Sequence, residues 1–242
     1  DQQRLAKKLI QYSHKIITIF KKEYDYYHAL APQKTVYFGH PLTLDHPQKP
    51  PLNAPLHPPY QIGLFPGSRI YEIQQNLPTM CRILAKLNNS AIQPTLYCSN
   101  QKLIATIQPI LSKYGLDSMA ILQKPTTPIH VAITAPGSNT LLLAFKQIPM
   151  VIVGKIPWFS YIVATYILRL HIPFIGLPNI ILGKPVCPEK IQHQTSNQGM
   201  AEAISNLLSS ESARSRMTHQ FHTLYADMTT APNYYDQVCD VL

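Results

Sequence analysis

The sequence has 242 residues, of which 45% are hydrophobic and only 14% charged, a composition typical of a globular protein that can bury a sizeable core. Lysine and arginine outnumber acidic residues 21 to 12, and the formal net charge of +9 favours nucleic acid, an anionic membrane surface or a phosphate-bearing small molecule as partner. The basic residues are scattered, without an aromatic RNA-binding signature or zinc-finger spacing, so nucleic acid is the least favoured and we expect none.

The cysteines and the missing metal motifs limit the chemistry further. No HExxH, Cys-His cluster or Asp-x-Asp motif occurs, so we expect no metal, and without Gly-x-Gly-x-x-Gly we expect no nicotinamide or other cofactor. The chain begins with Asp1 and carries no signal peptide, so we expect a cytosolic piece of a longer polypeptide. Reduced thiols are predicted for four widely spaced cysteines, Cys81, Cys98, Cys187 and Cys239.

The first elements in chain order are short. Residues 1–14 alternate charged and apolar positions at helical spacing and predict a helix, a buried strand follows at 15–20, and a second short helix precedes a strand at 35–38. Several prolines in residues 47–59 forbid a regular helix or a central strand. This segment is therefore predicted to be a stiff, extended linker.

Beyond the linker, strands and helices alternate regularly. Strands are predicted at 60–65, 94–98, 119–122, 130–134 and 150–154, and helices at 71–88, at 101–114 and from Thr140. Such alternation predicts an α/β fold, a Rossmann-like parallel sheet with helices on both faces. The last forty or so residues are predicted to form two amphipathic helices.

One apolar segment, 156–176, could be mistaken for a membrane span. Arg169 and two prolines interrupt it, and its longest uncharged run is too short to cross a bilayer comfortably. The net charge and the aromatic, apolar stretch Trp158–Leu170 leave peripheral membrane contact open. A solvated basic surface and a core helix explain the two features equally well.

The stretch LFPGSRIYEI, residues 64–73, is the first candidate binding loop. An apolar strand stops there and a helix begins. Gly67 lets the backbone approach a ligand closely, Ser68 can cap the helix and donate a hydrogen bond, and Arg69 can reach a phosphate as a forked donor. An ordinary strand-loop-helix corner with a serine cap and an exposed arginine explains the same residues.

The stretch TAPGSNTLLLAF, residues 134–145, repeats this arrangement. Small and polar residues join a strand to a helix, which makes a second candidate anion cradle. A plain N-cap explains them equally well. If the two strands are neighbours in one sheet, both loops can face a single diphosphate. The candidate residues here are Gly137, Ser138, Asn139 and Thr140.

The third stretch is GLPNIILGKPVCPEKIQ, residues 176–192. Its prolines predict a rigid, irregular segment. Asn179, Glu189 and Gln192 are polar groups among apolar ones, suited to holding a ribose or sugar hydroxyl. A buried loop whose polar side chains satisfy its own backbone is an equally good interpretation.

Taken in order, these motifs resemble the lipid-A-disaccharide synthase family, glycosyltransferases that join two acylated glucosamines. The last block is the most specific, because Leu-Pro-Asn followed at a fixed interval by Pro-Glu and Gln has no general structural reason to recur. The resemblance spans residues 16–192 and rests on the blocks ITIFKKEYDYY, VYFGHPL, LFPGSRIYEI, PGSNTLLLAFKQIPMVIVGK and GLPNIILGKPVCPEKIQ.

The resemblance implies a type-B glycosyltransferase fold, in which two Rossmann-like domains face each other across a cleft. Residues 1–46 match the tail of the N-terminal acceptor domain, and 47–59 would be the linker. Residues 60–242 would form the nucleotide-sugar-binding domain with C-terminal helices, the C-terminal half of the fold. We expect a cytoplasmic protein, and peripheral contact with the cytoplasmic face of the inner membrane stays open.

The reaction implied by the resemblance is an inverting hexosyl transfer without a metal. The 6-hydroxyl of 2,3-diacylglucosamine 1-phosphate attacks the anomeric carbon of UDP-2,3-diacylglucosamine, giving lipid A disaccharide 1-phosphate and UDP. Helix N-termini and cations must then meet the charge on the diphosphate. Arg69 and His40, the latter in the family's Gly-His-Pro, are the implied catalytic residues. The implied substrate-binding residues are Gly67, Ser68, Gly137, Ser138, Asn139, Thr140, Lys155, Asn179, Glu189 and Gln192.

The chain also departs from the family pattern. Leu142 stands where the family has the acid expected to hold the ribose, the segment 122–131 is short, and the linker is unusually rich in proline. Two other readings therefore stay open: a non-catalytic UDP-sugar or lipid-binding module, and another type-B enzyme such as a UDP-sugar epimerase.

Overall fold

The computed structural model describes residues 2–49, 55–87, 89–154, 174–191, 196–230 and 233–241. At the N-terminal end, two short parallel strands pair with each other, with Ile17 opposite Val36. The elements of this end are α1 (Gln2–Tyr12), β1 (Ile16–Thr18), α2 (Lys21–Leu30), β2 (Thr35–Tyr37) and α3 (Leu42–Asp45).

The main body is a six-stranded sheet in the order β5-β4-β3-β6-β7-β8, and every recorded pair of neighbours is parallel. The prediction of a parallel α/β sheet is confirmed. Its strands are β3 (Tyr60–Phe65), β4 (Ile92–Tyr97), β5 (Ala120–Leu122), β6 (Val131–Thr134), β7 (Met150–Gly154) and β8 (Glu189–Ile191).

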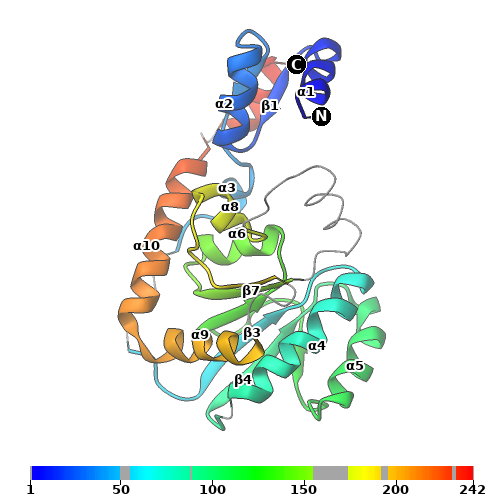
Figure 1. Ribbon diagram of the computed structural model, residues 1–242, viewed down its shortest axis with the longest axis vertical. Helices are drawn as coiled ribbons and strands as arrows, with labels where there is room; N and C mark the ends of the chain where they lie inside the picture. Colours follow the sequence, from blue (N-terminus) through cyan, green and yellow to red (C-terminus); the bar gives the residue numbers. More distant parts are fainter. Residues whose placement is uncertain are drawn as a thin grey trace.

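Helices cover both faces of this sheet, as predicted (Figure 1). On one face α4 packs against α5 and α9, and α9 also contacts β6 and β7; on the other, α6 contacts β6, α8 and α10. This result is expected from the right-handed crossovers that parallel strands favour, because the chain moves from β3 to β4 in one direction across the sheet and from β6 to β7 in the other. These elements are α4 (Ile70–Leu87), the 3₁₀ turn η1 (Gln101–Leu103), α5 (Ile104–Lys113), α6 (Ser138–Phe145), α8 (Leu177–Leu182), α9 (Asn197–Ser209) and α10 (Glu211–Met228).

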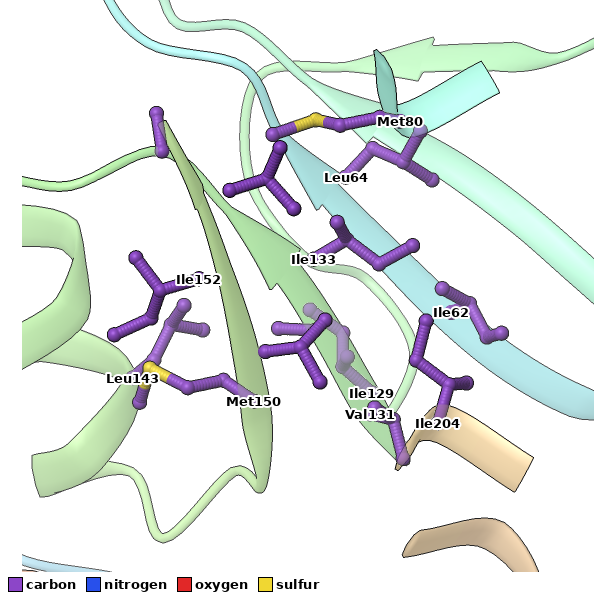
Figure 2. Close-up of a cluster of buried hydrophobic side chains, with 14 of the residues drawn as sticks. Ile62, Leu64, Met80, Ile129, Val131, Ile133, Leu143, Met150, Ile152 and Ile204 are labelled. Carbon is purple, nitrogen blue, oxygen red and sulfur yellow. The ribbon is translucent and has the colours of Figure 1, made fainter. Parts of the chain in front are cut away.

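The core explains why the central strands are continuously apolar. Every residue of β6 and β7 is buried, which is expected of parallel strands covered on both faces. Side chains alternate between the two layers, and Figure 2 shows members of both. One layer contains Ile62, Leu64, Val131 and Ile133 with Met80 and Ile204, and the other contains Met150 and Ile152 with Leu143.

The two ends of the chain meet beside the N-terminal strands (Figure 1). After α10, helix α11 (Tyr234–Val241) lies there, and the rings of Phe38 and Tyr234 are 6.3 Å apart. The hydroxyls of Thr43 and Thr230 are 3.0 Å apart and buried. The residues that follow α10 therefore contact the N-terminal segment.

Two predictions of local structure were wrong. The described residues from 196 onward form three helices instead of two, because Ser210 accepts a hydrogen bond from the amide of Ala213 and starts a new helix directly after Ser209. The segment from 176 is not irregular throughout: Pro178 stands in the first turn of α8, where its missing N–H costs nothing, and β8 follows.

The proposed linker lies only partly within the described residues. Its beginning contacts the body, since the amide of Lys49 donates to the carbonyl of Phe145 at 3.0 Å. The domain boundaries at residues 46 and 60 stay a prediction.

Candidate functional site

The two glycine loops leave adjacent strands. β3 and β6 pair in parallel with Phe65 opposite Thr134, and the amide of Ala135 donates to the carbonyl of Phe65 at 2.8 Å. The strand order reverses between them, because β3 leads to β4 on one side and β6 leads to β7 on the other. Ligands of open α/β sheets bind at this kind of switch point. The two strands are neighbours, which meets the condition for both loops to face one diphosphate.

The loop at Gly137 is open. This residue is the N-cap of α6 and adopts φ +128°, ψ −166°, a conformation that favours glycine. No described atom lies within 4 Å of the place where a Cβ would stand, and Gly137 and Ser138 are exposed. Thr140 holds the turn, since its Oγ1 donates to the carbonyl of Gly137 at 2.7 Å. The first amides of α6 can therefore receive an anion.

In the loop at Gly67, a side chain of the protein already binds the free amides. Oε2 of Glu72 accepts hydrogen bonds from the amides of Ser68 at 2.8 Å and Arg69 at 3.2 Å. Gly67 has φ +120°, and a Cβ there would lie 2.5 Å from that oxygen. The glycine thus makes room for the glutamate that caps α4, and this carboxylate, in place of a ligand, binds the amide of Ser68.

Sequence reasoning missed two residues that shape this loop. Glu72 stands three positions after Arg69, the spacing of the acid in a capping box, and that spacing could have identified it. Asn76 is buried and donates through Nδ2 to the carbonyl of Pro66 at 3.1 Å. The helical pattern of α4 does not identify Asn76, because it does not show which group a polar residue on the buried face of a helix will bind.

Arg69 keeps an available guanidinium. Its side chain is 82% exposed, and its contact with Glu72 is a 3.4 Å pair between Nη1 and Oε1. An exposed pair of this length contributes little to stability, so an anion can replace Glu72 as the partner of the guanidinium at a small cost in free energy.

Asn179 is committed to the protein itself. It is fully buried, and its Nδ2 donates to the carbonyl of Cys187 at 2.8 Å and to Oε1 of Glu189 at 2.7 Å. Its Oδ1 accepts from the amides of Val186 and Cys187 at 2.9 and 2.8 Å. Because an asparagine amide offers two donors and two acceptor positions, the predicted contact with a sugar hydroxyl is not available here.

Glu189 serves as a cap for α8. Its two carboxylate oxygens accept from the amides of Ile175 at 2.8 Å and Gly176 at 2.9 Å, in addition to Asn179. Burial raises the pKa of this carboxyl, and those hydrogen bonds act in the opposite direction. For Asn179 and Glu189, the interpretation in which polar side chains satisfy the loop's own backbone fits the geometry.

His40 lies at the junction between the N-terminal segment and α10. It is buried, its amide donates to the carbonyl of Met228 at 2.9 Å, and its ring centroid is 5.4 Å from that of Phe20. Nδ1 accepts from the amide of Leu42 at 3.2 Å, which leaves the proton of the neutral ring on Nε2. Burial lowers the pKa of His40, so the neutral form is favoured.

Several predicted features lie outside the described residues. Lys155 and Gln192 are among them, as is the apolar stretch Trp158–Leu170. Within the described part of the chain, no helix is long and apolar enough to cross a membrane. Across those same ranges, no three His, Cys, Asp or Glu side chains are grouped to hold a metal.

Comparison with solved structures defines the class. The chain matches sucrose-phosphate synthase from Thermosynechococcus elongatus with a TM-score of 0.57 and 13% identity, over 100% of this chain and 61% of that one. It matches TarM with a TM-score of 0.51 and 12% identity, over 99% of this chain and 45% of that one. At these identities the likeness shows the fold alone: the parallel, helix-flanked sheet of one half of a type-B glycosyltransferase.

Comparison of sequences then gives the family. The profile of the Lipid-A-disaccharide synthetase family matches residues 1–235, and the chain belongs to that family. It is 28% identical to the lipid-A-disaccharide synthase of Burkholderia lata over 225 residues, 86% of this chain and 57% of the relative. It is 30% identical to the lipid-A-disaccharide synthase of Coxiella burnetii (strain Dugway) over 159 residues, which cover 63% of this chain and 41% of the relative. The chain therefore spans about half the length of these relatives.

Proposed function

We propose that this chain is the nucleotide-sugar-binding half of a lipid-A-disaccharide synthase. The reaction transfers 2,3-diacylglucosamine from its UDP derivative to 2,3-diacylglucosamine 1-phosphate and releases UDP. Family membership over residues 1–235 supports this proposal. The observation that carries it is the open N-terminus of α6, one strand away from the exposed guanidinium of Arg69 at a switch point.

In this proposal the two loops hold the diphosphate in different ways. The amides of Ser138 and Asn139 receive phosphate oxygens at the positive end of α6, and Thr140 holds the turn. Arg69 binds the same group from the neighbouring loop as a forked donor. Gly67 and Ser68 shape that loop around Glu72. As UDP leaves, these donors stabilise its growing negative charge, with Lys155 as a second cation.

The third segment contributes indirectly in this proposal. Asn179 and Glu189 hold the backbone at the start of α8, so that the nucleotide sugar contacts the segment and not their side chains. Gln192, close after β8, is proposed to contact the sugar, as the family motif implies.

Residues 1–46 are proposed to be the tail of an acceptor-binding domain. A two-stranded parallel sheet is unusual alone, since parallel sheets are normally larger and covered on both faces. Beside it, α1 exposes Leu5 to 68% and Tyr12 to 80%. His40 would then lie where the two halves meet. A cytoplasmic location and peripheral contact with the inner membrane belong to the same proposal.

One observation favours a second candidate, a non-catalytic UDP-sugar-binding module. Leu142, in the middle of α6, is half-buried and stands where the family has the acid expected for the ribose. A carboxylate that binds two hydroxyls contributes roughly a few kcal/mol, so its absence weakens UDP binding unless a neighbour replaces it.

The test combines binding and turnover. We expect calorimetry of this chain to detect UDP without a divalent ion, and Leu142→Glu to tighten the complex by about tenfold or more. The full-length protein, given both acylated substrates, should form the disaccharide phosphate. UDP binding without any disaccharide would favour the non-catalytic module, and no UDP binding at all would overturn both readings.

A further inference from the structure

A groove outside the candidate site lies between α9, α10 and the segment that leads from α8 into β8. Its volume is about 680 Å³. In Figure 1 the chain after α8 runs beside α10 toward β8, at the amino end of that strand. The glycine loops, by contrast, follow the carboxyl ends of β3 and β6. The groove is lined by Lys184, Pro185, Val186, Pro188, Ala203, Asn206, Leu207, Ala213, Ser215, Arg216, Met217, His219 and Gln220.

One wall of the groove is held rigidly. The amide of Val186 donates to Oδ1 of Asn179 at 2.9 Å, and the amide of Lys184 donates to the carbonyl of Asn179 at 3.3 Å. Because Asn179 is fully buried and uses all its amide positions, it fixes the path of this wall. A wall formed in advance lowers the cost of ordering a ligand against it.

The floor is apolar and belongs to the core. Leu207, Ala213 and Met217 are buried, and the sulfur of Met217 lies 3.4 Å from the amide of Met150 in β7. Nη1 of Arg214 donates to the carbonyl of Leu207 at 3.0 Å, which joins the end of α9 to the start of α10. The depth and shape of the groove are therefore set by the packing of two helices on the sheet.

The rim carries positive charge and hydrogen-bond donors. Lys184 and Arg216 are exposed on opposite sides, on the wall and on α10, and His219 lies one turn further along α10. Of the described residues that line the groove, none carries a carboxylate. A cationic rim above an apolar floor complements a ligand with an anionic head and an apolar body.

We propose that this groove binds a lipid with a net-anionic phosphomonoester head group. The phosphate lies between Lys184 and Arg216 with His219 as a further donor, and the apolar part rests on Val186, Leu207 and Met217. This site is separate from the diphosphate site and does not depend on the proposed transfer activity.

The ligand class is tested with a monomeric lipid, dihexanoyl phosphatidic acid, and its zwitterionic counterpart, dihexanoyl phosphatidylcholine. Calorimetry of this chain should show saturable binding of the first, and binding of the second at least roughly tenfold weaker, because its phosphodiester carries less negative charge and Lys184 and Arg216 repel its choline cation. Equal binding of the two lipids would overturn the proposal. Inorganic phosphate that binds as tightly as the lipid would also overturn it, since the apolar floor would then contribute nothing.

The location is tested with matched charge reversals. The double variant Lys184→Glu with Arg216→Glu should bind phosphatidic acid more weakly than the unchanged chain, by about tenfold or more. Lys102→Glu with Lys113→Glu, in η1 and α5, makes the same change in net charge on exposed residues and should leave binding unchanged. If both pairs weaken binding equally, the effect is one of net charge and the groove is not the site.

A neutral substitution and a bilayer complete the experiment. Ala203→Phe fills the groove without a change of charge and should also abolish binding, with the thermal midpoint as the check on folding. If Ala203→Phe binds phosphatidic acid as tightly as the unchanged chain, the proposal is wrong. Sedimentation with phosphatidic acid vesicles distinguishes the source: loss of sedimentation on charge reversal assigns the lipid to a bilayer, and binding of the monomer alone assigns it to free lipid.

Discussion

The two glycine loops look alike in sequence and differ in the structure. Each joins a buried parallel strand to a helix, and each has a glycine at a φ that side chains rarely adopt. At Gly67 the amides of Ser68 and Arg69 are bound by the carboxylate of Glu72, whereas no described side chain caps α6 at Gly137 and the space beside that glycine is open. A strand-glycine-helix motif therefore shows where anion binding is possible, and the nearest carboxylate decides whether the position is free.

The largest expected effect separates the two glycines. Gly67→Ala should lower the free energy of unfolding by about 4 kcal/mol, from backbone strain and from the collision with Glu72. Gly137→Ala should cost about 2 kcal/mol of strain alone but weaken UDP binding, because its methyl group enters the ligand's space. Chemical denaturation and calorimetry measure both quantities.

Gly115→Ala is the matched control for this pair. Its φ is +68°, and no described atom lies within 4 Å of the added Cβ, so a cost of about 1 kcal/mol and unchanged UDP binding are expected. The comparison of the loops fails if Gly67→Ala and Gly137→Ala lose the same stability and the same affinity.

The next effect tests the arginine between the loops. In the full-length protein, Arg69→Ala should reduce transfer by about 100-fold or more, because a donor to the leaving diphosphate is lost. Stability should change little, since the side chain is exposed. Arg82→Ala, which changes an exposed arginine on α4, the helix that follows Arg69, should leave transfer unchanged. Near-normal transfer by Arg69→Ala would remove Arg69 from the mechanism.

A smaller effect sharpens the role of the internal carboxylate. Glu72→Gln keeps an oxygen for the amides of Ser68 and Arg69 but removes the negative charge beside the guanidinium. UDP should bind roughly threefold to tenfold more tightly, and the thermal midpoint should change little. Weaker UDP binding would mean that the charge of Glu72 orients Arg69 for the ligand.

The smallest effect concerns the junction and pH. Because burial lowers the pKa of His40 in the folded state, the unfolded chain binds a proton more readily, and this contribution to stability is lost as pH falls below the usual histidine range. Chemical denaturation between pH 7 and 5 should show that the free energy of unfolding falls less steeply with pH in His40→Gln than in the wild type. His222→Gln, at an exposed position of α10, is the control and should follow the wild type. An unchanged decline in His40→Gln would show that His40 does not titrate with folding.

Most of the main sheet could be predicted from the sequence. Strands β3 and β7 occupy the predicted residues 60–65 and 150–154, and β4, β5 and β6 differ from the predicted strands by a residue or two at their ends. Strand β8 was not predicted, because its residues lie in the segment expected to be irregular. This succeeded because strands covered on both faces must be apolar along their whole length, and because glycine and proline mark the turns locally. The C-terminal helices were less accurate, since the single cap at Ser210 is a weaker signal than helical periodicity.

By itself the sequence determined the parallel fold, the two glycine loops that each join a strand to a helix, and the family. Only the tertiary structure decided which loop is open, that Asn179 and Glu189 bind their own backbone, and that His40 lies at the junction with α10. The physical reason is that composition and periodicity report which residues are buried. The partner of a polar group depends on contacts between segments far apart in the chain, which no local pattern records.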